Sequence, residues 1–135
     1  MGQALPYELI LIDDDPEDIE LFSLAIENLK FPVRFSFFKG CFEALEALVN
    51  RAKGRFPDVV FLDVFMNPVD GFACLKAIKD SEQLAKIPVI IYSHAVNLHQ
   101  KMKLKTLGAG DILIKPIDMR QLTEYVIRLI SERDD

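Results

Sequence analysis

The sequence predicts an α/β protein in which five parallel strands form one sheet with helices on both faces. Short, wholly apolar segments alternate along the chain with longer segments whose apolar residues recur at helical spacing. The short segments are continuously apolar, as expected of strands in a sheet that is buried on both faces. Right-handed crossover connections then produce a doubly wound sandwich of three layers.

The composition fits a single globular domain. The chain has 135 residues, of which 50% are hydrophobic and 27% charged, and its net charge of −5 argues against broad nucleic-acid binding. It has neither an apolar run long enough to span a membrane nor a signal peptide. We therefore expect a cytoplasmic protein in which Cys41 and Cys74 are reduced core residues. Residues 1–6 are expected to be a flexible lead-in, residues 7–132 the domain, and residues 133–135 a short tail.

Each element is predicted from its own local pattern. The strands are expected at residues 9–12, 33–38, 59–62, 89–92 and 112–114. Asp15 and Asp118 are expected to cap the first and last helices, Asp70 to open the third, and Gly108 to end the fourth. The side chains expected to face the core are Ile19, Phe22, Ile26 and Leu29 in the first helix, Phe42, Leu45, Leu48 and Val49 in the second, and Met119, Leu122, Val126, Leu129 and Ile130 in the last.

Polar residues follow four of the five strands. Asp13 and Asp14 follow the first strand, Asp63 the third, Ser93 the fourth and Lys115 the fifth. Each has an ordinary structural explanation by itself, as a helix cap, a turn residue or a surface lysine. Because the carboxyl ends of parallel strands share one edge, we expect all five to meet in one site. A carboxylate such as Asp63 at the end of a buried strand requires such partners.

Four motifs carry a resemblance to a known family. They read LIDDD, FLDVFMNPVDG, PVIIYS and ILIKP, and their order and spacing resemble the receiver domain of two-component response regulators from about Tyr7 to Glu132. The resemblance implies a flavodoxin-like (βα)5 fold with the strand order 2-1-3-4-5. It also implies a phosphoacceptor signalling protein that catalyses only its own phosphorylation and dephosphorylation.

The resemblance implies a phosphoryl transfer that depends on Mg²⁺. Asp63 would accept the phosphoryl group from the phosphohistidine of a sensor histidine kinase or phosphotransfer protein. Mg²⁺ would be held by Asp14, Asp63 and the backbone carbonyl of Phe65, with Asp13 acting mainly through a bound water.

The resemblance also implies a conformational switch. Lys115 would pair with Asp63 at rest and with a phosphate oxygen after transfer, and Ser93 would donate its hydroxyl to another. Ile112 stands where the family often has a switching aromatic residue, so rotamer coupling is expected to be weakened or rerouted. His94 either narrows access to the phosphate or bonds to it, or is a rim histidine without a role.

Two further features bear on the loop and on the partners. Asn67 stands where the family usually has proline, with Pro68 one place later, which is expected to alter the loop beside the Phe65 carbonyl. Lys101, Lys103 and Lys105 make the fourth helix basic, which is either a solvated face or a partner surface. The resemblance places the downstream protein target on the fourth helix, fifth strand and last helix.

The chain ends soon after its last helix, which favours a single-domain regulator, although a fragment of a longer protein would look the same. A pseudo-receiver that binds partners without being phosphorylated is the first alternative. A Mg²⁺-dependent phosphatase or hydrolase is less favoured, because one such class needs an aspartate where Phe65 stands. Flavin binding is disfavoured by the lack of a Ser/Thr/Gly-rich loop after the first strand. Neither direct nucleic-acid nor membrane binding is expected.

Overall fold

Five parallel strands and five helices alternate along the chain. The computed structural model describes residues 6–51, 54–66, 70–115 and 117–134. The strands are β1 (Tyr7–Ile12), β2 (Val33–Phe38), β3 (Val59–Leu62), β4 (Val89–His94) and β5 (Asp111–Lys115). The helices are α1 (Pro16–Glu27), α2 (Cys41–Val49), α3 (Gly71–Asp80), α4 (Leu98–Thr106) and α5 (Met119–Asp134). None of these described helices is long and apolar enough to cross a membrane.

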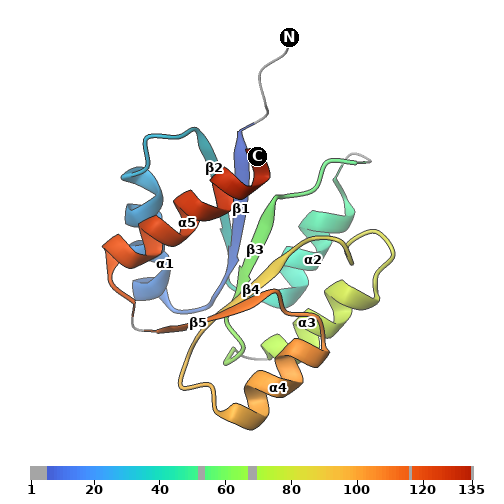
Figure 1. The fold of residues 1–135 in the computed structure, drawn as a ribbon. Helices are drawn as coiled ribbons and strands as arrows, with labels where there is room; N and C mark the ends of the chain where they lie inside the picture. The colour runs from blue at the N-terminus through green and yellow to red at the C-terminus, as the bar shows by residue number, and fades with distance from the viewer. Residues whose placement is uncertain (1–5, 52–53, 67–69, 116, 135) are drawn as a thin grey trace.

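The sheet has the predicted topology. Its strands lie in the order β2-β1-β3-β4-β5, and every neighbouring pair is parallel. Helices α1 and α5 cover one face, and α2, α3 and α4 cover the other (Figure 1). The predicted doubly wound, flavodoxin-like fold is therefore confirmed.

Successive side chains of the central strands point to opposite faces of the sheet. They contribute to two hydrophobic clusters, one on each face. On the α1–α5 face the rings of Phe22, Phe61 and Tyr92 pack edge to face, with the centroid of Phe22 5.0 Å from that of Phe61 and 5.5 Å from that of Tyr92. The residues of β1, β3 and β4 are almost all buried, as predicted. The prediction is wrong for the edge strands β2 and β5, where exposed and half-buried residues are mixed. An edge strand has a neighbour on one side only, so the helices cover it incompletely.

The predicted capping residues lie at the ends of the helices. The carboxylate of Asp15 accepts a hydrogen bond from a backbone N–H of the first turn at 2.9 Å, that of Asp70 does so at 2.9 Å, and that of Asp118 at 2.7 Å. Gly108 follows α4 with a φ of +108°, a conformation that favours glycine. These helix ends can be predicted from the sequence because each depends only on neighbouring residues.

The predicted core face of α2 is partly wrong. Phe42 is 66% exposed and Val49 is also exposed, whereas Cys41, Ala44 and Leu48 are buried. The helix begins at Cys41, so the residues three and seven positions later share the inward face. Two smaller side chains thus take the place that the sequence pattern assigned to larger ones.

Cys41 and Cys74 form a disulfide that joins α2 to α3. Both residues are buried, as predicted, but the prediction that they are reduced is wrong in this structure. The two helices lie on the same face of the sheet and bring the Cα atoms to 5.8 Å, within the normal range for a disulfide. A sequence separation of 33 residues carries no local signal of this pairing.

We expect reduction of this disulfide to destabilise the fold. The bond closes a loop of intermediate length, so its loss should lower the free energy of unfolding by about 2–4 kcal/mol. Urea unfolding with and without dithiothreitol measures the difference. The pairing itself is checked by alkylating the urea-unfolded protein without reductant. Alkylation of both cysteines under those conditions would contradict it.

Candidate functional site

The polar residues predicted from the strand ends meet at the carboxyl edge of the sheet. Asp13 follows β1 directly, and its N–H donates to the carbonyl of Phe38 at the end of β2 (3.0 Å). Asp63 follows β3, and its N–H donates to the carbonyl of Ile12 (2.9 Å). The sheet hydrogen bonding thus continues one residue past each strand and holds both aspartates in place.

Three carboxylates form a compact acidic cluster. Oxygen atoms of Asp13, Asp14 and Asp63 all lie within 4.8 Å of one another. Asp13 and Asp63 are buried, whereas Asp14 is more exposed. Carboxylate oxygens at this spacing could hold a divalent cation, and hard oxygen ligands are those that Mg²⁺ prefers.

The carboxylate of Asp63 is held by directed hydrogen bonds. The hydroxyl of Ser93, on β4, donates to Asp63 Oδ1 at 2.6 Å, and the backbone N–H of Phe65 donates to the same oxygen at 3.0 Å. Ser93 is fully buried, so its hydroxyl has no solvent to compete for this bond. Asp63 therefore has a defined orientation before any reaction.

Lys115 contacts three carboxylates. Its Nζ lies 2.6 Å from Asp13 Oδ2, 2.7 Å from Asp18 Oδ2 and 3.3 Å from Asp63 Oδ2. The expected pair with Asp63 is thus present, but it is the longest of the three contacts. Asp18 was not among the residues predicted from the sequence to lie in this site. Its position in the first turn of α1, directly after the acidic triplet, was the available signal.

Burial and neighbouring charges shift the pKa values of the residues in this cluster. Burial raises the pKa of Asp13 to about 6, although the hydrogen bond from Lys115 opposes the rise. Burial alone would lower the pKa of Lys115, but its hydrogen bonds to Asp13 and Asp18 outweigh burial and hold that pKa above its ordinary value. Lys115 is therefore a permanent cation among carboxylates that outnumber it.

The remaining candidate residues lie around this centre. His94 is exposed, and its Nε2 is 4.0 Å from Asp18 Oδ2. Ile112 is half-buried and packs against the hydrophobic cluster on the α2–α4 face. The Asn67-Pro68 step lies outside the described residues.

Gly71 determines how closely α3 approaches the strand that carries Asp63. Its N–H donates to the carbonyl of Val64 at 2.9 Å. A Cβ on Gly71 would lie 2.3 Å from Val64 Cα and 2.6 Å from the carbonyl oxygen of Asp63, which no side chain can tolerate. The close approach keeps the backbone after Asp63 against the start of α3.

A parallel sheet in this order, with aspartates, a serine and a lysine at its carboxyl edge, defines a class of phosphoacceptor signalling domains. A family model described as the response regulator receiver domain matches residues 9–127. The chain belongs to this family. Receiver domains receive phosphoryl groups from histidine kinases, bind Mg²⁺ at an acidic pocket, and are signalling phosphoacceptors rather than enzymes in the usual sense.

Two known proteins are similar in sequence to this chain over most of its length. The chain is 27% identical over 128 residues to the DNA-binding dual master transcriptional regulator RpaA of Synechocystis, covering 93% of this chain and 50% of RpaA. It is 27% identical over 124 residues to the signal transduction histidine-protein kinase BarA of Escherichia coli, covering 92% of this chain and 13% of BarA. The chain thus spans half or less of the length of these two relatives.

A solved structure also matches closely. The crystal structure of the phosphorylated cyanobacterial phytochrome response regulator RcpA superposes with a TM-score of 0.79 at 25% identity, covering 90% of this chain and 89% of RcpA.

The raised pKa of Asp13 predicts an unusual pH dependence of stability. The folded protein keeps this proton up to about pH 6, whereas the ordinary pKa is 3.8. The stability contributed by protonation of Asp13 is therefore full below about pH 4 and is lost as pH rises through about 6. We expect Asp13→Asn, which cannot ionise, to gain roughly 2–3 kcal/mol relative to the native chain between pH 4 and pH 7.

Urea unfolding in metal-free buffer at the two pH values measures this gain. The control is Asp80→Asn, which removes an exposed carboxylate paired with Lys76 and should leave the pH profile unchanged. A difference between Asp13→Asn and the native chain that stays constant with pH would contradict the account.

Proposed function

We propose that Asp63 accepts a phosphoryl group from the phosphohistidine of a sensor histidine kinase or phosphotransfer protein, in a Mg²⁺-dependent reaction. The observation that carries this proposal is the geometry of Asp63, whose two oxygens are contacted by Ser93 and Lys115 beside two further aspartates. The domain that performs this function is proposed to comprise residues 7–132.

The donor set of the acidic cluster fits Mg²⁺. Asp13, Asp14 and Asp63 supply closely spaced carboxylate oxygens, and one lysine cannot neutralise all of them. The backbone carbonyl of Phe65 is proposed as a further ligand. Its N–H already bonds to Asp63, which keeps this part of the backbone beside the cluster. When bound, Mg²⁺ supplies positive charge that lets two anions approach each other.

The side chains of the site define the transfer step. A carboxylate oxygen of Asp63 forms a bond to phosphorus while the bond from phosphorus to the donor histidine nitrogen breaks. The electron pair of the broken bond stays on the histidine nitrogen, and the product is an acyl phosphate. Lys115 and Ser93, which contact the two oxygens of Asp63, are proposed to donate hydrogen bonds to the new phosphate oxygens.

The same two residues are proposed to operate the switch. Ser93 ends its bond to Asp63 when it donates to the phosphate, and this draws in the chain between β4 and α4. Half-buried Ile112 takes the place of the aromatic residue often found in the family. His94 is exposed, and we assign it a position on the rim of the site without a further role.

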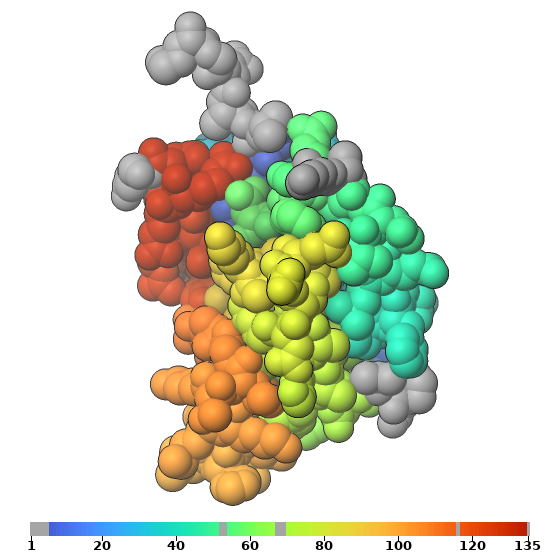
Figure 2. Space-filling view, turned by 90° about the vertical axis from the view of Figure 1, so that its right-hand side faces the viewer, coloured from blue at the N-terminus to red at the C-terminus, as the bar shows by residue number. Residues whose placement is uncertain are grey.

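The surface formed by α4, β5 and α5 is proposed to bind the downstream protein target. Helix α4 projects at one corner of the molecule (Figure 2). It exposes Leu98 (74%) and Met102 (61%), large apolar side chains that a partner could cover. We propose that this receiver domain acts in the cytoplasm. A disulfide such as Cys41–Cys74 is uncommon in that reducing compartment, so we expect the disulfide to be reduced there.

Incubation with Mg²⁺ and acetyl phosphate, followed by intact mass measurement, tests the phosphoacceptor. We expect one added phosphoryl group on the native chain and on Asp80→Asn, and none on Asp63→Asn. The adduct should also disappear when the metal is chelated. A native chain that neither gains this mass nor binds beryllofluoride would instead be a pseudo-receiver that acts only as a binding module.

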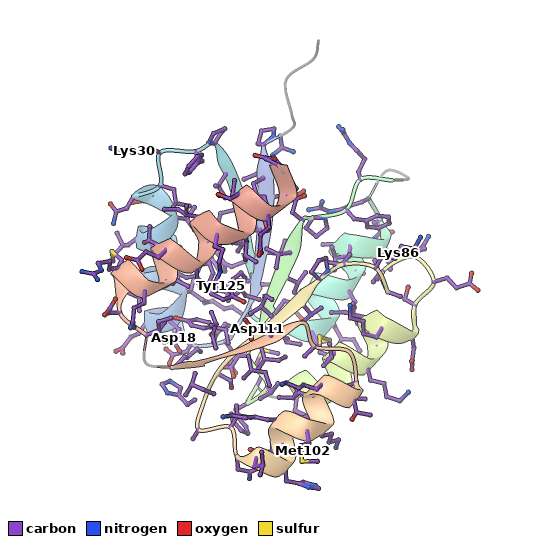
Figure 3. The ribbon with its side chains drawn as sticks, in the orientation of Figure 1. Asp18, Lys30, Lys86, Met102, Asp111 and Tyr125 are labelled. Carbon is purple, nitrogen blue, oxygen red and sulfur yellow. A yellow bond between two sulfur atoms is a disulfide. The ribbon has the colours of Figure 1, made fainter. Side chains whose placement is uncertain are left out.

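Charge reversal on α4 tests the partner surface. We expect substitution of Lys101, Lys103 and Lys105 by glutamate to abolish capture of the partner by the beryllofluoride-loaded protein. Electrostatic complementarity governs encounter and register at such surfaces. Reversal of Lys30 and Lys86, which lie away from α4 (Figure 3), is the control and should leave capture intact. Unchanged capture of the partner by the α4 variant would contradict the assignment of this surface.

A further inference from the structure

Asp18 is the residue of the phosphoryl site that neither the metal cluster nor the transfer step requires. It lies in the first turn of α1, beside the carboxyl end of β5 (Figure 3). Its Oδ2 is 2.7 Å from Lys115 Nζ, 0.6 Å closer than the 3.3 Å that separates the same nitrogen from Asp63. The resting lysine is therefore held more tightly by Asp18 than by the proposed phosphoacceptor.

The donor capacity of Lys115 makes this contact consequential. An ammonium group has three N–H donors, and Lys115 directs hydrogen bonds to Asp13, Asp18 and Asp63. Its side chain is 1% exposed, so water does not supply a replacement partner. A phosphate oxygen can therefore gain a bond from Lys115 only when one of the three carboxylates gives up its own.

We propose that Asp18 is a positioning residue that restrains Lys115 in the resting state and so weakens the site's hold on a phosphoryl group. Asp18 competes with the phosphoryl group for a donor of Lys115. Its negative charge also opposes the charge that arrives with the group. The inference rests on the proposed function of Asp63, because it concerns the affinity of that same site for its phosphoryl group.

The surroundings of Asp18 leave Lys115 as its main partner. Among the described residues, the basic side chains within ion-pair distance of Asp18 are Lys115 at 2.7 Å and His94 at 4.0 Å. The side chain of Asp18 is 16% exposed, so its pair with Lys115 is shielded from solvent. Glu17, the preceding residue, is exposed and has the same charge, which makes it a matched control.

Affinity for beryllofluoride in the presence of Mg²⁺ tests the proposal, because this probe mimics the phosphoryl group at equilibrium. We expect Asp18→Asn to bind the probe about 3- to 10-fold more tightly than the native chain. The amide oxygen of asparagine is a neutral and weaker acceptor for Lys115, and this range corresponds to the net contribution of one ordinary hydrogen bond. Glu17→Gln should stay within about 2-fold, since exposed charges contribute little. Asp18→Glu, which restores the carboxylate, should return the affinity toward that of the native chain.

The same substitution in a chain that lacks the Lys115 ammonium distinguishes restraint of Lys115 from a simple change in charge. We expect Asp18→Asn to give no gain in affinity when Lys115 is replaced by methionine, because no ammonium remains to be released. The same gain in both backgrounds would overturn the proposal. Thermal unfolding of each variant identifies any that fail to fold, and the comparison in the native Lys115 background stands without the double variant.

The outcomes distinguish this inference from the function on which it rests. If the native chain binds beryllofluoride and Asp18→Asn binds it no more tightly than Glu17→Gln does, the inference about Asp18 is wrong and the phosphoacceptor proposal stands. If the native chain neither binds the probe nor accepts a phosphoryl group at Asp63, the proposed function itself fails.

Discussion

One buried ammonium group holds together the carboxyl edge of the sheet. Lys115 lies among Asp13, Asp18 and Asp63, and without its charge these carboxylates would repel one another where solvent screening is weak. The same excess of negative charge suits the edge to a divalent cation. Stability and proposed chemistry therefore rest on the same contacts, and the resting site has more carboxylates than its own cation can neutralise.

The fold supplies this edge through backbone geometry. Parallel strands deliver the residues that follow them to one side of the sheet, and the sheet hydrogen bonds extend to Asp13 and Asp63. Gly71 then lets α3 start directly against the backbone after Asp63. The hydrophobic clusters on the two faces of the sheet hold the strands in register, so the positions of the polar residues are set by packing remote from them.

The sequence predicted most of the architecture, because apolar runs, helix caps and the order of the motifs are local signals. It also placed Asp13, Asp14, Asp63, Ser93 and Lys115 at one edge. It predicted the pair of Lys115 with Asp63 but not the contact of Lys115 with Asp18, since that contact depends on the rotation of α1, which carries Asp18. The disulfide and the exposure of Phe42 were missed for a similar reason, because both depend on how α2 rotates and packs against its neighbours.

The acyl phosphate that we propose at Asp63 can be detected directly by its chemistry. Borohydride reduces an acyl phosphate to an alcohol, which would convert the aspartate that carries the phosphoryl group into homoserine. Peptide mapping after treatment with acetyl phosphate, Mg²⁺ and borohydride should find homoserine at position 63 and aspartate at positions 13, 14 and 18. Homoserine at another position, or a phosphoryl group that survives borohydride on a serine or histidine, would contradict the account.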